Sequence, residues 1–416
     1  MTKMPPMPTP ISKKPSSSRL LRALLAGSSC GALLHASAVF AEEGDAFRYG
    51  GGLSVQYENN LFRRSDSSPL GTPSDTSVRA YGLLGFDKVW SRQRFYGDFV
   101  FGRVSYMDFS DLDYNREDFS AGWKGNFPHE INTQLDWKQT QSLASFSDLV
   151  IKRRNVITRD NIDGSIDVPV IANWHIVGGA GYQQSRNSND IDKVNDLNGT
   201  YGEGGVRYAT NYGNHLDVVY RELHSEYINR VASARVDAEF VERTADLRIQ
   251  WAATGNNTLE GRAGFVRREH ETLSYRDFAG PSFRLTDTWT LGGSTTIVTS
   301  IYRTMGAAGD TEFDYAVTKG LRIAPVYQIT GKMSLTGALE WQNRRYFGSY
   351  TSDVLGLQGV QSGQTYRDLQ AELGLNYQAL RWLNMRLSYT GQKRNADSAL
   401  AEYTAHTVLL DAQLSF

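Results

Sequence analysis

The chain has a single cysteine among its 416 residues, Cys30, and it lies close to the N-terminus. The remainder therefore offers no disulfide framework and no thiolate that could bind a metal or act as a nucleophile. Basic tracts with interleaved aromatic residues are also missing, so we expect no nucleic-acid partner. The most apolar stretch beyond the N-terminal region, 168–177, is broken by Asn173 and His175. It is far shorter than the about 20 residues that a transmembrane helix needs.

The N-terminal region has the composition of a leader. Residues 1–41 carry basic but no acidic side chains, a small and apolar stretch covers 20–39, and the tripeptide 39–41 fits the small-residue rule for cleavage. This pattern predicts a secretory signal peptide over 1–41, Sec-type export and Glu42 as the first mature residue. Cys30 is then a small residue of the leader rather than a site of lipid attachment. Without the five basic residues of the leader, 39 of the 44 Lys and Arg remain against 45 Asp and Glu, a formal charge of −6.

Residues 42–416 contain about eighteen segments in which apolar and polar side chains alternate. A period of two places the two sets on opposite faces of a β-strand. Short connections are expected near 90–94, 126–130, 169–173, 209–214, 252–257, 291–294, 330–332 and 378–381. Long polar connections are expected near 58–74, 108–115, 143–153, 185–196, 227–234, 271–280, 305–313, 347–363 and 394–403.

Short turns on one side and long loops on the other are typical of bacterial outer-membrane barrels, whose short turns face the periplasm. We therefore predict an all-β fold, a transmembrane antiparallel β-barrel of about 18 strands that spans 42–416 as one domain. The expected location is the outer membrane of a Gram-negative bacterium. An even number of strands places both ends of the barrel on the periplasmic side.

The segment that ends at Phe416 alternates most clearly. Phe416, Leu414 and the residues at 412, 410 and 408 are apolar, while most residues between them are polar. An aromatic residue that closes such a strand is the mark of the last strand of an outer-membrane barrel. We therefore predict that Phe416 and Leu414 form the assembly signal that the barrel-insertion machinery reads. Outer-membrane lipid is the second predicted partner, because the apolar faces must meet hydrocarbon.

Tryptophan gathers at one side of the predicted barrel. An indole ring prefers the headgroup level, where its apolar body and its N–H are both satisfied, so this side reads as the periplasmic aromatic girdle. A soluble barrel whose tryptophans cover a core is the alternative, and eighteen strands with a polar interior could not supply that core. Six of the 8 tryptophans lie near a proposed short turn: Trp90, Trp123, Trp174, Trp251, Trp289 and Trp382.

The polar faces of the predicted strands line a lumen. Most charges there are expected to stabilise one another across the wall rather than to bind a substrate. We nevertheless expect a local positive strip of four arginines. We also expect the pore to prefer small cations weakly, and this preference should fade as the ionic strength rises. The strip consists of Arg248, Arg262, Arg322 and Arg386. The other lumen-lining candidates are Arg344, Asp246, Glu260, Glu340, Asp368, Glu372 and Asp411.

No catalytic signature stands out. The seven histidines form no HExxH, and neither GxSxG nor a nucleotide-binding loop occurs. The glycine runs 178–181 and 202–205 lie within predicted strands, where glycine marks bends or tight contacts. The run from Asp111 to Glu117 alternates oxygen ligands but lacks the central glycine and terminal glutamate of a calcium loop. We therefore expect no enzyme, no metal site and no cofactor.

One resemblance is more specific. It is carried by the strand and turn motifs GGGL at 50–53, YENNLFR at 57–63, GFDK at 85–88, QRF at 93–95, FSDLDY at 109–114 and AGW at 121–123. In this succession the chain resembles the β-barrel porins of exopolysaccharide biosynthesis operons associated with exosortases, the EpsL type. The resemblance runs over the whole mature length. It implies an outer-membrane component in the export of a secreted polysaccharide, and it brings no functional residues.

Two functions follow from these patterns. In the first, the lumen conducts, and the partners are a polysaccharide and periplasmic export components. In the second, the barrel is plugged and acts as a surface scaffold or adhesin through its long loops, notably 58–74 and 347–363. A steady single-channel current distinguishes the first function from the second.

Overall fold

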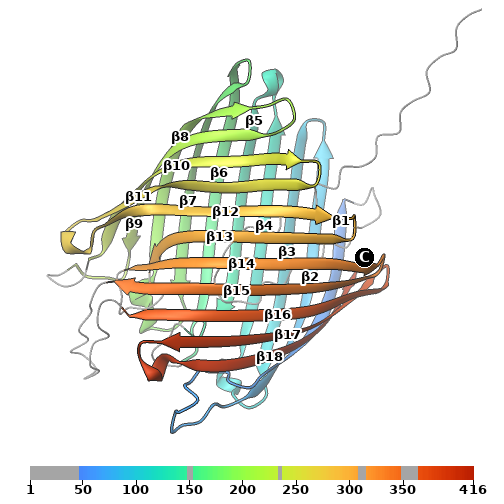
Figure 1. Ribbon diagram of the computed structural model, residues 1–416, viewed down its shortest axis with the longest axis vertical. Coiled ribbons are helices and arrows are strands. Elements are labelled where there is room, and N and C mark those ends of the chain that lie inside the picture. The colour runs from blue at the N-terminus through green and yellow to red at the C-terminus, as the bar shows by residue number, and fades with distance from the viewer. Residues whose placement is uncertain (1–45, 148–152, 233–236, 308–314, 348–363) are drawn as a thin grey trace, which may run out of the picture. The chain divides into compact units, whose positions relative to one another are not determined.

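The computed structural model describes residues 46–147, 153–232, 237–307, 315–347 and 364–416 (Figure 1). The predicted leader 1–41 lies outside these residues, as does most of the predicted loop 347–363. The described strands are β1 (Phe47–Glu58), β2 (Asp75–Trp90), β3 (Gln93–Tyr106), β4 (Tyr114–Asn126), β5 (Asn132–Leu143), β6 (Val156–Ile171), β7 (Trp174–Asn187), β8 (Leu197–Ala209), β9 (His215–Tyr227), β10 (Glu239–Thr254), β11 (Asn257–His270), β12 (Phe278–Leu291), β13 (Thr295–Ala307), β14 (Tyr315–Thr330), β15 (Met333–Phe347), β16 (Thr365–Leu380), β17 (Leu383–Ala396) and β18 (Tyr403–Ser415).

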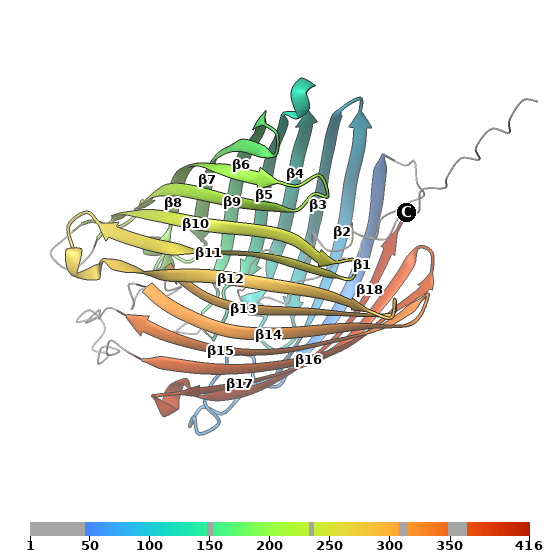
Figure 2. The same ribbon diagram turned by 45° about the horizontal axis from the view of Figure 1, so that its top comes forward.

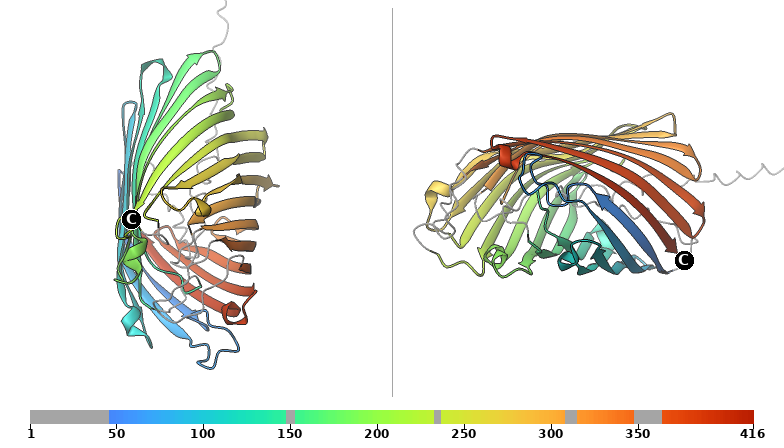
Figure 3. Two further views of the ribbon diagram at one scale, coloured as in Figure 1. Left: turned by 90° about the vertical axis from the view of Figure 1, so that its left-hand side faces the viewer. Right: turned by 90° about the horizontal axis from the view of Figure 1, so that it is seen from below.

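These strands form one closed antiparallel sheet. Each strand pairs with its neighbours in the chain, and β1 also pairs with β18, so the 18-stranded sheet has no free edge. Figure 2 shows β1 and β18 side by side, and Figure 3 shows the wall curving round on itself. Closure gives every strand a hydrogen-bonded neighbour on both sides, which matters in a bilayer because unpaired backbone N–H and C=O groups are costly there. The prediction of an antiparallel barrel of about 18 strands is confirmed.

Glycine allows the closing seam between β1 and β18 to form. A Cβ atom on Gly50 would lie 2.1 Å from the carbonyl oxygen of Leu414, and one on Gly52 would lie 2.4 Å from the hydroxyl group of Tyr81. No side chain fits at either position without a shift of its neighbours. The GGGL motif at 50–53 therefore serves the close approach of β1 to the strands on both sides of it.

The connections alternate in length as the sequence predicts. Each predicted short connection contains or overlaps an observed turn, for example the two residues between β2 and β3 and the two between β14 and β15. Short 3₁₀ helices interrupt several connections: η2 (Ser110–Leu112), η3 (Pro128–Glu130), η4 (Asp192–Asn195), η5 (Ser274–Arg276) and η6 (Ala399–Ala401). Because the first and last strands begin and end beside the short turns, this side is the periplasmic one.

The outer surface of the barrel is apolar. In β16, Leu369, Leu373 and Tyr377 are 47%, 56% and 40% exposed, and the acidic residues Asp368 and Glu372 alternate with them on the other face. Large exposed apolar side chains of the same kind follow most other strands: Leu53, Leu84, Phe101, Val218, Leu247, Phe265 and Leu410. Such a surface on a closed barrel faces hydrocarbon, which places the protein in the outer membrane. In the described part of the chain, no helix has the length and apolar character to cross a membrane.

The periplasmic tryptophans lie on this outer surface. Trp90, Trp174 and Trp289 are 75%, 49% and 47% exposed and lie near strand ends beside short turns, and Trp382 is 42% exposed in the turn between β16 and β17. Two further tryptophans lie farther along their strands, Trp137 against Phe119 and Trp341 on β15. The exposed rings at the turns have the placement of an aromatic girdle.

A charge introduced on the outer surface should destabilise the barrel. We expect Leu373→Arg, near the middle of β16, to lower the free energy of unfolding by about 2–4 kcal/mol, because the guanidinium group would lie in hydrocarbon. The matched control is Gln370→Arg on the inward face of the same strand, where we expect a smaller loss. Urea titration of the barrel folded into vesicles measures both, and equal losses would contradict the assignment of the two faces.

Candidate functional site: the barrel interior

The inward faces of the strands are polar and charged. An ion pair that skips a strand identifies this concave face: Arg248 on β10 donates two hydrogen bonds to Glu203 on β8, at 2.9 and 2.8 Å, across β9. Similar pairs occur elsewhere in the interior, where Arg207 on β8 binds both Asp217 and Asp167 at 2.7 Å. Most interior charges are therefore partnered, as expected for side chains that stabilise the wall.

Four inward arginines lie together on β9–β12, and we call Arg221, Arg248, Arg262 and Arg284 the arginine cluster. Arg248 is directly opposite Arg262 in the sheet, and Arg262 is opposite Arg284. Within the described residues, the carboxylates at ion-pair distance from Arg221, Arg248 and Arg262 are Glu203 and, at 3.9 Å, Asp246. Arg262 is exposed to the interior. These three arginines thus outnumber the carboxylates that bind them.

Two tyrosines accompany the cluster. The guanidinium carbon of Arg221 lies 3.5 Å from the ring centroid of Tyr201, and that of Arg284 lies 4.4 Å from the centroid of Tyr302. Stacking on a ring uses the face of the guanidinium group and leaves its N–H donors, which lie in its plane, for another partner. The cluster can therefore hold arginines in fixed positions while they still bind a carboxylate or a hydroxyl group.

The other two residues of the predicted strip, Arg322 and Arg386, are not cross-strand neighbours of the cluster. Arg322 on β14 binds Glu340 at 3.0 Å, and Glu340 also accepts hydrogen bonds from Tyr302 at 2.6 Å and from Gln342 at 2.7 Å. Arg386 on β17 donates to Glu372 on β16 at 2.6 Å. The strip predicted from the sequence is thus divided, because Arg248 and Arg262 are cross-strand neighbours whereas Arg322 and Arg386 belong to separate ion pairs.

The remaining candidates also lie on inward strand positions. Asp246 has 5% of its surface exposed, and Asp411 accepts from Ser54 at 2.5 Å and from Tyr81 at 3.3 Å. Glu260 on β11 is opposite Gln250. Arg344 donates to the hydroxyl group of Tyr346 at 3.1 Å. Arg221 and Arg284 of the cluster were not predicted from the sequence, although both lie at positions that the alternation assigns to the lumen.

The extracellular mouth is narrowed by loops that fold inward. The third loop follows β5, yet the carbonyl oxygen of Ser147, in the first described residues of this loop (144–147), accepts a hydrogen bond of 2.6 Å from Arg394 on β17. The strand order puts β18 and β1–β4 between β5 and β17. A loop that leaves β5 and reaches β17 within a few residues has to pass over the interior rather than along the rim.

Arg394 anchors this contact. Its guanidinium group binds both carboxylate oxygens of Asp368, at 2.6 and 3.0 Å, and lies 4.7 Å from the ring centroid of Tyr366 and 5.2 Å from that of Tyr403. The first loop (residues 59–74) reaches the same strand, since Arg63 donates to Gln392 at 3.1 Å. Neither contact could be predicted from the sequence.

An apolar cluster holds the two loops against each other. Phe62 of the first loop lies 4.9 Å from Phe146 of the third, measured between ring centroids, and 4.9 Å from Phe109 of the second loop. Leu61 and Leu112 are 3% and 1% exposed within the same cluster. The start of the first loop, which the scaffold hypothesis places at the cell surface, therefore packs against the other loops at the mouth, whereas Leu70 farther along the loop is 73% exposed.

The other motifs of the sequence have structural roles. The carboxylate of Asp113 accepts the backbone N–H of Tyr106 at 2.8 Å, which lowers the pKa of that carboxyl, and it also binds Arg103 at 3.1 Å. The described residues contain no group of three or more potential ligands that could hold a metal ion. The glycine runs 178–181 and 202–205 lie within β7 and β8.

No protein-family model matches the chain, and the search among curated proteins found no match. Solved structures share its fold. The chain is similar to a BenF-like porin from Pseudomonas fluorescens Pf-5, with a TM-score of 0.50 and 12% identity over 89% of this chain and 99% of that porin. It is also similar to OccK9 (OpdG) of Pseudomonas aeruginosa, with a TM-score of 0.50 and 13% identity over 89% of this chain and 98% of that one. OpdK of the same species gives a TM-score of 0.49 and 12% identity over 89% of this chain and 99% of that one.

These identities are so low that the likeness establishes a shared fold and nothing further. The chain is an outer-membrane β-barrel of porin-like fold, which confirms the coarser part of what its resemblance to the EpsL type implies. The finer part, a place in exopolysaccharide export, remains a prediction.

Proposed function

We propose that the barrel is an outer-membrane channel that takes part in the export of an acidic exopolysaccharide. The arginine cluster carries this proposal, because it presents guanidinium donors to the interior on four adjacent strands. Guanidinium groups bind carboxylates in a planar, bidentate geometry, and uronate and pyruvyl groups supply such carboxylates along a polymer. The resemblance to the EpsL type supports a secreted polysaccharide as the cargo.

The geometry of the cluster suits a substrate that moves. Arg221 and Arg284 lie on tyrosine rings, which hold their guanidinium groups in fixed positions. Arg262, exposed to the interior, is free to exchange one carboxylate for the next. A polymer would then pass by successive contacts, each weak enough to break. In this proposal no residue performs a catalytic step, and periplasmic export components deliver the polymer.

The second candidate is a plugged barrel that serves as a scaffold. The inward-folded first and third loops favour it, since their apolar cluster and the bond from Arg394 to Ser147 obstruct the mouth. The same loops fit a channel that narrows and gates its cargo. For an open channel we still predict a weak preference for small cations. Carboxylates and arginines both line the interior, so neither charge dominates strongly.

Export in cells tests the proposal. We expect Arg262→Gln/Arg284→Gln to lower exported acidic polymer about threefold to tenfold, because two charge-assisted contacts are lost. The matched control is Arg386→Gln, an inward arginine that is bound to Glu372 and lies outside the cluster. Polymer in the medium is measured at equal amounts of folded barrel. Unchanged export in the double variant would leave the cluster as a structural part of the wall.

A further inference from the structure

A row of basic side chains follows the outer surface of the barrel near its extracellular rim. It consists of Arg303 on β13, Lys319 on β14, Arg345 on β15, Arg367 on β16 and Lys393 on β17, and we call it the basic strip. The register puts these residues on the lipid-facing side. Arg303 is opposite Lys319, and two residues below them Ile301 is opposite the exposed Leu321. The strip is thus an outer feature, separate from the arginine cluster in the interior.

The strip lies at the outer boundary of the hydrocarbon. Counted from the periplasmic end of its strand, Arg303 is the ninth residue, Lys393 the eleventh, Lys319 the twelfth, Arg345 the thirteenth and Arg367 the fourteenth. A tilted strand crosses the hydrocarbon in about 9–11 residues. These cations therefore meet the headgroups of the outer leaflet, with the apolar wall below them.

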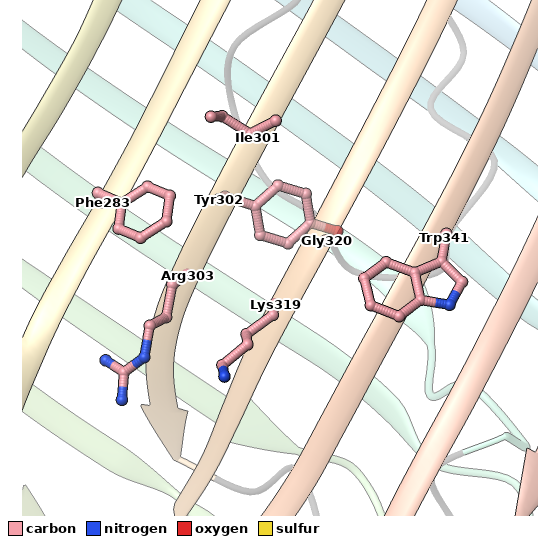
Figure 4. A pocket seen from close by; sticks show the side chains of 7 residues that line it. All are labelled: Phe283, Ile301, Tyr302, Arg303, Lys319, Gly320 and Trp341. Carbon is pink, nitrogen blue, oxygen red and sulfur yellow. The ribbon is translucent and has the colours of Figure 1, made fainter.

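Two adjoining hollows in the surface coincide with the strip. One, of about 310 Å³, is lined by Phe283, Ile301 and Trp341 together with Arg303 and Lys319. Figure 4 shows Arg303 and Lys319 on neighbouring strands, between the rings of Phe283 and Trp341. This hollow lies where β12 separates from β13, since their pairing ends at Phe283 and Arg303.

The second hollow continues from the first toward the rim. It has about 410 Å³ and shares Arg303 and Lys319 with the first. Arg345, Arg367 and Asn343 add polar groups to it, and Phe278, Val317 and Phe347 add apolar surface. Basic groups above an apolar hollow match the two parts of a phosphorylated lipid.

Within the described part of the wall, the strip has no acidic counterpart. Among the described residues, no carboxylate lies at ion-pair distance from any of the five side chains, and Lys319, Arg345, Arg367 and Lys393 are exposed. The outer surface of β9–β11 differs, because Arg243 binds Glu222 and Glu269, and Arg267 also binds Glu269. Like charges in a row repel unless a counter-charge comes from outside the protein.

We propose that the basic strip is a binding site for the phosphorylated glycolipid of the outer leaflet, lipopolysaccharide. Its lipid A phosphates accept hydrogen bonds from Arg303, Lys319, Arg345 and Arg367, and its acyl chains lie on the apolar wall and in the hollow beside Trp341. This occupant is favoured over a soluble anion because the strip is positively charged, lies at the level of the headgroups and stands directly above an apolar surface. The site is independent of what passes through the lumen.

Native mass spectrometry of the full-length barrel in detergent, with added bisphosphorylated lipid A, tests the site. We expect Lys319→Gln/Arg345→Gln to weaken lipid A binding about tenfold or more. The matched control is Arg103→Gln/Arg186→Gln, which removes two basic side chains from β3 and β7 in the other part of the wall, and which should bind like the wild type. A heat-modifiable shift in gel mobility verifies that both variants are folded.

Two further measurements distinguish binding of the phosphorylated lipid from binding of free phosphate. Lipid A without phosphates should bind about tenfold more weakly than the bisphosphorylated form, and millimolar inorganic phosphate should not displace the latter. Equal binding by wild type and the Lys319/Arg345 variant would overturn the proposal, as would equal binding of the dephosphorylated lipid or displacement by phosphate. A dimer mass that the same variant abolishes without lipid would assign the strip to a second copy instead.

Discussion

Phe416→Asp is expected to lower the amount of folded barrel in the outer membrane about tenfold or more. The ring of Phe416 stacks on Tyr49 at 5.6 Å and on Trp382 at 6.1 Å between centroids, and its backbone exchanges hydrogen bonds with Tyr49. Each ring pair contributes about 0.5–1.5 kcal/mol, and a loss of 1.4 kcal/mol corresponds to a tenfold change. The substitution also removes the aromatic residue that we expect the insertion machinery to read.

The control for this prediction is Ser415→Asp on the inward side of the same seam. Ser415 is opposite Gly50 in β1, where the carboxylate would meet the wet interior. We expect this variant to assemble nearly as well as the wild type. Surface labelling and heat-modifiable gel migration measure both variants. Equal yields of Phe416→Asp and the wild type would refute the role of Phe416 in closing and assembling the barrel.

Arg394→Gln is expected to release the third loop and raise the conductance of the barrel. Loss of one partner from a buried ion pair costs about 3–5 kcal/mol, and the same change removes the hydrogen bond to Ser147. The third loop then loses its anchor on β17, and we expect the mouth to widen. Currents across planar bilayers measure the effect.

Arg386→Gln is the matched control, because it removes an arginine from the inward face of the same strand. Arg386 binds Glu372 and has no contact with a loop among the described residues. We expect its conductance to equal that of the wild type. If the two variants conduct equally, the third loop does not set the width of the path.

The sequence predicted the wall of the barrel but not its mouth. Alternation identifies strands because one face meets lipid and the other water, and this physical contrast is repeated in every strand from β1 to β18. The same alternation assigns residues such as Arg262 and Leu373 to a face. It contains no information on which inward residues meet across strands, because the stagger of the strands sets the register.

The loops show the limit most clearly. The contact of Arg394 with Ser147 joins residues 247 positions apart, and neither residue stands in a recognisable motif. Phe62, Phe109 and Phe146 could be read as apolar side chains in polar loops, but their common cluster depends on how three loops fold over one mouth. The basic strip was missed for a related reason. Each of its residues lies at an outward position of its strand, and only the alignment of these positions across five strands makes them a site.

Single-channel recording of the full-length barrel with an added oligouronate examines conduction and recognition of an acidic polymer together. We expect a steady open current that the oligouronate interrupts, with shorter interruptions in Arg262→Gln/Arg284→Gln than in the wild type or in Arg386→Gln. A barrel that stays silent, or a wild-type current that the oligouronate leaves unchanged, would contradict it.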